Sequence, residues 1–203
     1  MPYSKNLSFI HDQGFGELAK NASIFISQKS KDINKQPFIV DLGCGSGIMA
    51  KELIKKGGRV YGIDISKEMI AIAQKKAPQA KFKVGSFLDE EIPTCDVISG
   101  VGEVFNYLFD KKIDLKSLNK FFRKCHKALK KNGILIFDIM EFSKKINHNR
   151  KGFKIDKNWA VLSENIVDPK TKILKRVITS FVKHGKNYER TDETHEVLLL
   201  DTN

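Results

Sequence analysis

A carboxylate and three evenly spaced glycines form the first candidate site in the sequence. Asp41, Gly43, Gly45 and Gly47 alternate within FIVDLGCGSGIMA, an apolar run that gives way to a helical pattern. Glycine tolerates left-handed backbone conformations and lets a ligand approach the main chain closely. Such a turn between a buried strand and a helix is typical of nucleotide-type ligand sites.

Three classes of ligand could explain this turn: a phosphate, a dinucleotide, and a ligand with a cationic amino-acid portion. A phosphate-binding P-loop needs GxxxxGK[ST], which is absent here. The stretch Gly45–Ala50 does match the dinucleotide pattern GxGxxA, with Asp64 near the expected distance of about 20 residues downstream. However, Asp41 adds a negative charge that a pyrophosphate would not use. It favours a ligand with a cationic amino-acid portion.

The elements that position these residues alternate between strand and helix from Pro37 onward. Before Pro37 we expect a polar opening segment followed by a helix that includes Phe15 and Ile26. The predicted strands are Phe38–Leu42, Arg59–Asp64, Lys81–Gly85, Cys95–Val101 and Ile134–Met140. The predicted helices are Ile48–Lys56, Lys67–Ala77 with Ser66 as its cap, and Leu115–Lys131 ending at Asn132-Gly133.

This alternation predicts an α/β fold with a parallel sheet covered on both faces. Such sheets bind ligands beyond the carboxyl ends of their strands. The residues at or near those ends are Asp41, Asp64, Ser86, Gly100 and Asp138. We therefore expect the functional site there.

The last part of the chain has a different pattern. Trp159–Asp168, Ile173–His184 and Tyr188–Leu200 are β-rich, and turn signals at Asp168-Pro169 and around Gly185 separate them. They predict an antiparallel meander appended to the parallel sheet. The stretch Lys144–Lys154 is expected to be a basic loop that could bind an anionic substrate.

Composition limits the class of protein. A length of 203 residues with 41% hydrophobic and 30% charged residues fits one soluble domain. No apolar run reaches membrane-spanning length, and the first 20 residues lack a signal-peptide core, so we expect a cytoplasmic protein. The three cysteines lack zinc-site spacing, and we predict no metal.

The net charge of +12 suggests an anionic partner, but its make-up argues otherwise. Only five of the 36 basic residues are arginines, and the lysines are spread along the chain. Nucleic-acid recognition favours the planar guanidinium group. We interpret the charge as a solvated surface.

Five motifs in order give a family resemblance. VDLGCGSG, GIDIS, GSFLDEEIP, CDVISGVGEVFNYLF and LKKNGILIFDI resemble the successive motifs of class I S-adenosylmethionine-dependent methyltransferases, over residues 37–140. The resemblance implies a Rossmann-like, doubly wound sheet in strand order 3-2-1-4-5. It also implies an N-terminal helical cap (1–36), a donor-binding core (37–141) and a β-rich cover over the acceptor (142–203). The family's usual last helix and final strand pair are expected to be missing.

The resemblance implies roles for the glycine-rich turn. Gly43, Gly45 and Gly47, with Cys44 between them, would let the backbone approach the methionine part of S-adenosylmethionine. Asp41 would support the loop and, directly or through water, the donor's ammonium group.

The remaining donor contacts follow the other strands. Asp64 would accept hydrogen bonds from the ribose hydroxyls, and Ile65 would pack on the adenine. Ser86 and Phe87 occupy the place where the family often has an aspartate against the adenine amino group. Three residues would lie near the transferred methyl group: Gly100, Val101 and Gly102.

The methyl acceptor is less defined. Glu103 is the first candidate for a general base, although it could equally begin the next helix, and His11, expected in a polar loop, is the second. Further carboxylates near the site are Asp138 and Glu141. We expect a small-molecule acceptor, with Trp159, Tyr188 and His195 as candidate walls, in a monomer or homodimer.

Three alternatives stay open. The first is a donor-binding protein without turnover. The second is a nucleic-acid methyltransferase, although the chain lacks NPPY- or DPPY-type residues after the fourth predicted strand. The third is an oxidoreductase with a nucleotide cofactor.

Overall fold

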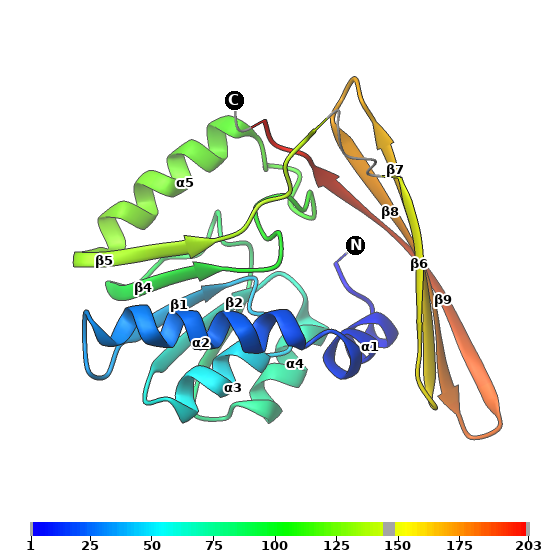
Figure 1. The fold of residues 1–203 in the computed structure, drawn as a ribbon, viewed down its shortest axis with the longest axis horizontal. Helices are drawn as coiled ribbons and strands as arrows, with labels where there is room; N and C mark the ends of the chain where they lie inside the picture. Colours follow the sequence, from blue (N-terminus) through cyan, green and yellow to red (C-terminus); the bar gives the residue numbers. More distant parts are fainter. Residues whose placement is uncertain (1, 144–148, 202–203) are drawn as a thin grey trace. The chain divides into compact units, whose positions relative to one another are not determined.

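A computed structural model describes residues 2–143 and 149–201. Packing divides the chain into two units. The parallel unit comprises Gly16–Phe105 and Lys112–Asp138, and the antiparallel unit comprises the described residues of Met1–Phe15, Asn106–Lys111 and Ile139–Asn203. Each unit has its own sheet (Figure 1).

The parallel unit contains the predicted sheet. Its strands are β1 (Phe38–Leu42), β2 (Arg59–Asp64), β3 (Lys81–Val84), β4 (Cys95–Gly100) and β5 (Leu129–Phe137). They pair in parallel in the order β3-β2-β1-β4-β5, which confirms the predicted fold class. The predicted bounds of the first two strands are correct to the residue. The last four residues of β1, from Ile39 to Leu42, are buried, as expected for a strand covered on both faces.

Helices cover this sheet on its two faces (Figure 1). On one face lie α2 (Glu17–Lys31), α3 (Ile48–Lys55) and α4 (Lys67–Lys76), and on the other lies α5 (Leu115–Ala128). Ser66 caps α4 as predicted, because its hydroxyl accepts a hydrogen bond from Met69 N. Phe105 is fully buried among the rings of Phe87, Phe121, Phe122 and Phe137.

The end of α5 differs from the prediction. The helix ends at Ala128 instead of Lys131, and β5 begins at Leu129, which pairs with Cys95. Asn132 does adopt a left-handed conformation, with φ of 65°. It does so inside β5, where the pairing with β4 is irregular before it resumes at Ile134. The predicted C-cap signal thus marks a strand irregularity.

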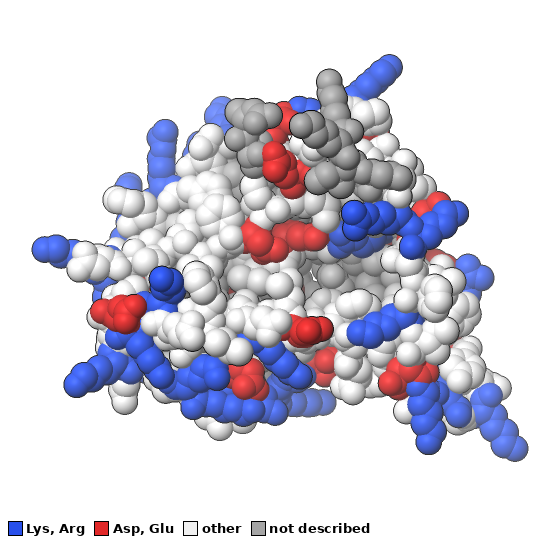
Figure 2. Space-filling model, viewed as in Figure 1, with Lys and Arg blue, Asp and Glu red and all other residues white. Residues whose placement is uncertain are grey.

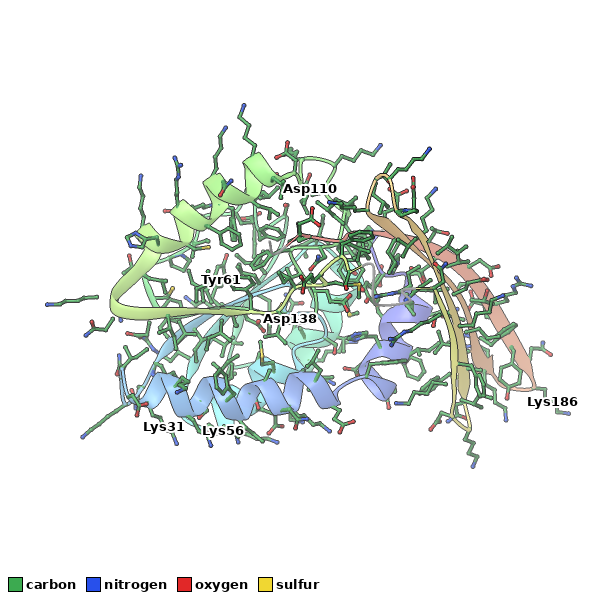
Figure 3. All side chains as sticks on the ribbon, turned by 45° about the horizontal axis from the view of Figure 1, so that its top comes forward. Lys31, Lys56, Tyr61, Asp110, Asp138 and Lys186 are labelled. Atoms are coloured by element: carbon green, nitrogen blue, oxygen red, sulfur yellow. The ribbon has the colours of Figure 1, made fainter. Side chains whose placement is uncertain are left out.

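The antiparallel unit contains α1 (Lys5–Gly14) and a sheet of four strands. These are β6 (Arg150–Ile155), β7 (Trp159–Asp168), β8 (Ile173–His184) and β9 (Asn187–Leu198), paired in chain order. The predicted meander is therefore confirmed. Leu7 and Ile10 of α1 pack with Trp159 and Val161 in an apolar cluster. Lys186, labelled in Figure 3, lies in the β8–β9 turn.

Two expectations for this unit were wrong. His11 was expected in a polar loop, but Ser4 caps α1 and the helix buries Leu7 and Ile10, so His11 lies on a helix. The second part of the expected basic loop, from Arg150 onward, is strand β6. Residues 144–148 of that stretch lie outside the described residues.

Surface charge agrees with the interpretation of a solvated surface. In Figure 2, Lys and Arg side chains are spread over the visible face with Asp and Glu among them. Within residues 2–143 and 149–201, no helix is long and apolar enough to cross a membrane.

Candidate active site

The glycine-rich turn joins β1 to α3 at the carboxyl end of the parallel sheet. Gly43, Gly45 and Gly47 all have positive φ, at 61°, 51° and 74°. A Cβ on Gly43 would lie 2.5 Å from a methyl group of Val104, and one on Gly47 would lie 2.9 Å from Ala73. Any other residue at these two positions would combine backbone strain with a clash. The sequence thus requires glycine there for conformation and for space.

Asp64, the last residue of β2, holds this turn in place. One carboxylate oxygen accepts a hydrogen bond from Gly45 N and the other from Ser66 N, each at 2.8 Å. Burial raises the pKa of Asp64, although these two hydrogen bonds oppose the rise. Each carboxylate oxygen has two lone pairs, so both can still accept a second hydrogen bond from a ligand.

Asp41 is a buried carboxyl group with one unused oxygen. It is only 1% exposed, and Ser99, its register partner on β4, donates a hydrogen bond of 3.0 Å to Oδ1. Among the described residues, Oδ2 has no hydrogen-bond partner. Burial raises the pKa of Asp41 to about 7; the Ser99 hydrogen bond lowers it, and the charge of Asp64 raises it further. An unsatisfied buried oxygen of this kind suits a cationic ligand group.

Cys44 lies in the same turn, and its main-chain N donates a hydrogen bond to Ile63 O of β2. Its side chain is buried, which raises the pKa of the thiol well above its ordinary value, and the nearby carboxylates raise it further. A thiol that stays protonated is a poor nucleophile. Cys44 therefore contributes packing through its side chain and a hydrogen bond through its main chain.

The end of β4 forms a second turn, which Asp138 stabilises. Gly102 and Glu103 both have positive φ, at 99° and 63°. The carboxylate of Asp138, which immediately follows β5 and is labelled in Figure 3, accepts a hydrogen bond from Gly102 N at 2.7 Å and from Glu103 N at 3.2 Å. No helix begins at Glu103, since α5 starts only at Leu115. The alternative of a helix-start acid is therefore wrong.

Gly100 and Val101 lead into this turn. A Cβ on Gly100 would lie 2.9 Å from the ring of Phe105, so the fully buried ring leaves no room for a side chain. Val101 packs partly buried against the core on the α2–α4 side of the sheet. The backbone at the end of β4 is thus fixed from both sides.

The segment after β3 combines a turn with core packing. The carbonyl of Ser86 accepts hydrogen bonds from Asp89 N and Glu90 N, and its hydroxyl accepts one from Leu88 N. The ring of Phe87 is buried, and its centroid lies 4.7 Å from that of Phe121. Of Phe87, only the main chain is therefore left for contact with a ligand. Ile65, directly after Asp64, is half-buried.

All of these residues belong to the parallel unit, whereas His11 belongs to the antiparallel unit. Its ring stacks on Phe15 at 5.8 Å, and burial lowers its pKa despite the opposing charge of Asp12. Within the described ranges, no group of three or more His, Cys, Asp or Glu side chains could hold a metal ion. Ser99 was not predicted as part of the site, because its pairing with Asp41 depends on the register of β1 and β4. The local signal was a single serine after the apolar residues Val97 and Ile98 of β4.

Known proteins share this sequence and fold. Residues 39–133 match a family model described as a methyltransferase domain. A protein of Geobacillus sp. (strain WCH70) with a provisional methyltransferase name is 29% identical over 187 residues, which are 84% of this chain and 72% of that protein. The crystal structure of an S-adenosylmethionine-dependent methyltransferase from Clostridium acetobutylicum is 25% identical and superposes with a TM-score of 0.78 over 96% of this chain and 81% of that one.

Residues 39–133 form a methyltransferase domain, and the chain has the fold of class I S-adenosylmethionine-dependent methyltransferases. A ubiquinone biosynthesis O-methyltransferase of Pelagibacter ubique is a further relative, 28% identical over 48% of this chain and 39% of its own length. The site of this methyltransferase fits its cofactor. S-adenosylmethionine carries a ribose, for which Asp64 has free lone pairs, and an ammonium group, which suits the unused oxygen of Asp41.

Proposed function

We propose that this methyltransferase transfers the methyl group of S-adenosylmethionine to a small-molecule acceptor. The observation that carries the proposal is the arrangement of Asp41, Asp64 and the glycine-rich turn at the carboxyl ends of β1 and β2. The acceptor class is supported by the Pelagibacter relative, whose name specifies methylation of oxygen in ubiquinone biosynthesis. The scarcity of arginine supports a small molecule over a nucleic acid.

The geometry of the parallel unit supports each proposed donor contact. Asp64 accepts hydrogen bonds from the ribose hydroxyls while Gly45 N and Ser66 N keep its carboxylate in place. Asp41 pairs with the ammonium group through Oδ2, which is the oxygen that Ser99 leaves unused. Gly43 and Gly47, with Cys44, present only main chain to the methionine portion.

The adenine and the methyl group lie along the neighbouring strand ends in this proposal. Ile65 packs on the adenine face, and Ser86 with the main-chain amide of Phe87 binds the adenine edge. The turn formed by Gly100, Val101 and Gly102 faces the transferred methyl group, and Asp138 keeps that turn rigid.

The reaction is an in-line displacement at the methyl carbon. The sulfonium group is already an activated leaving group, so the protein contributes mainly alignment and exclusion of water. An acceptor that must lose a proton also needs a base. Glu103 and His11 are the candidates that the sequence provides.

Titration calorimetry with S-adenosylhomocysteine tests the donor site. Asp64→Ala should abolish binding, because it removes both the ribose acceptor and the support of the turn. Asp64→Asn, which keeps one acceptor oxygen, should bind more weakly than wild type. Asp32→Ala, an exposed carboxylate that follows α2, is the matched control and should bind like wild type. Full affinity in Asp64→Ala would reject the ribose assignment.

Turnover is tested by following S-adenosylhomocysteine formation with a set of small hydroxyl, amine and carboxyl compounds. Methylation of at least one of them is expected. Donor binding without turnover on any compound, or turnover only on RNA or DNA, would contradict the proposed acceptor class.

A further inference from the structure

The sheet of the antiparallel unit has two faces, and α1 covers one of them (Figure 1). Side chains alternate between the faces along each strand, and the register aligns them across the strands. Leu7 and Ile10 of α1 pack on one face against Trp159, Val161, Ile178 and Val182. His195 is buried on that same face, whereas Tyr188 lies on the opposite one, which we call the outer face.

The outer face consists of the odd-numbered residues of β6 and β8 and the even-numbered residues of β7 and β9. Among the described residues of this unit, α1 is the only helix, and it packs on the other side. A sheet with one face on the core normally presents polar side chains on its second face. The outer face does not follow this rule.

Large apolar side chains lie exposed on the outer face. On the edge strand β6, Phe153 is 77% and Ile155 is 70% exposed. Leu162, the register partner of Phe153 on β7, is 47% exposed, and Val177 on β8 is 37% exposed. We call these four residues the apolar centre. A contiguous exposed apolar patch on a folded protein marks an interaction surface.

The charges of the outer face cancel. It carries four basic and four acidic side chains, whereas the whole chain has a net charge of +12. The eight residues are Lys151, Lys175, Lys183, Arg190, Glu164, Asp168, Asp192 and Glu196. Six of them form three ion pairs, at 3.0, 2.9 and 4.0 Å: Lys151–Glu164, Arg190–Asp192 and Lys175–Glu196. These pairs flank the apolar centre, in the manner of an interface with an apolar middle and a polar rim.

This neutrality distinguishes between partners. A chain with a large net positive charge repels a second copy of itself. On the outer face that repulsion is absent, because each positive charge is matched by a negative one. An acidic protein, a nucleic acid or an anionic membrane gains its attraction from unmatched lysines and would gain none from this face. The partner that fits best is a second copy of the chain.

The size of the outer face also suits a dimer. Strands β6 to β9 have 6, 10, 12 and 12 residues. At about 3.4 Å per residue and about 4.8 Å between strands, they present a face of about 650 Å² before side chains add relief. A stable interface of standard size buries about 800 Å² on each partner. Two such faces can pack sheet on sheet, as in a β-sandwich.

We propose that two copies of this chain form a dimer in which their outer faces pack against each other about a two-fold axis. The same patch is used by both copies, as in any interface of this symmetry. Phe153, Ile155 and Leu162 are buried from water at its middle, and the ion pairs form its rim. The proposal is independent of the proposed function, because no residue of the outer face belongs to the parallel unit.

Sedimentation equilibrium over a wide dilution series tests the proposal. The average mass of wild type should rise with concentration from 23.1 kDa to twice that value and no further. Phe153→Glu and Leu162→Glu should each raise the dissociation constant of the dimer at least about 30-fold, the usual effect of removing a central interface side chain. Added salt should leave the wild-type dimer intact, because its interface is apolar and neutral.

The control is Leu115→Glu at the start of α5, in the parallel unit. Leu115 is 65% exposed, and this variant should dimerise like wild type. Circular dichroism should be unchanged in all variants, and Ile155→Ser supplies a milder change on the same face if a glutamate variant unfolds. A wild type that stays monomeric, a dimer that dissociates as salt is raised, or folded outer-face variants that dimerise like wild type would overturn the proposal.

Discussion

Replacement of Asp41 by Asn should remove a pH-dependent loss of stability. In the folded chain, burial raises the pKa of this carboxyl group to about 7, whereas an unfolded chain has a value of about 3.9. Between these values the folded state binds more protons than the unfolded state, so the free energy of unfolding falls as pH rises. The loss is absent below about pH 4 and complete above about pH 7. Its full size is about 4 kcal/mol, since each pKa unit corresponds to about 1.4 kcal/mol.

Urea unfolding followed by circular dichroism at about pH 5 and pH 8 measures this effect. From the same two pKa values, wild type should lose about 2.5 kcal/mol more than Asp41→Asn over that interval. The Asn side chain retains an acceptor for Ser99 and leaves its second polar atom unsatisfied, as Oδ2 is now. That cost of about 1–3 kcal/mol is independent of pH and cancels in the difference.

Donor binding should show the complementary dependence. An ionised Asp41 pairs with the ammonium group, so the affinity for S-adenosylhomocysteine should rise with pH through about 7 in wild type and stay flat in Asp41→Asn. Parallel pH–stability curves for the two proteins would refute the reasoning, because Asp41 would then ionise at the same pH folded and unfolded.

Five further substitutions, one of them made in combination, test the turns and the core of the parallel unit. Gly43→Ala should destabilise by about 2–4 kcal/mol through left-handed strain plus the clash with Val104, whereas Gly45→Ala, with open space around its Cβ, should cost only about 1–2 kcal/mol in urea unfolding. Gly43→Ala combined with Val104→Ala should recover the steric part. Asp138→Ala removes the acceptor of two main-chain amides, so calorimetry should show at least about tenfold weaker S-adenosylhomocysteine binding. Phe105→Ala should lower the unfolding free energy by about 3–5 kcal/mol, because the ring is fully buried among four others.

Strand and helix periods in the sequence predicted the parallel unit well. Buried parallel strands such as Phe38–Leu42 are continuous apolar runs, and glycine or capping residues mark their ends, so local signals agree with the fold. The antiparallel strands were found for a similar reason, since turn residues separate them.

The parts that were missed depend on contacts distant in sequence. The sequence of α1 looks polar because only a few of its apolar residues are buried. Leu7 and Ile10 become core residues only through packing on Trp159, which is distant in sequence. Likewise, Ser99 and Asp41 become partners through strand register, which no local pattern contains. The left-handed Asn132 was detected, but whether it ends a helix or interrupts a strand is decided by pairing with β4.

Calorimetry of wild-type protein with S-adenosylhomocysteine and with NAD tests the central claim most directly. The arrangement of Asp41, Asp64 and the glycine-rich turn predicts binding of S-adenosylhomocysteine at one site per chain and no binding of NAD. Binding of NAD without binding of S-adenosylhomocysteine would contradict the claim that this turn is built for a charged amino-acid nucleoside.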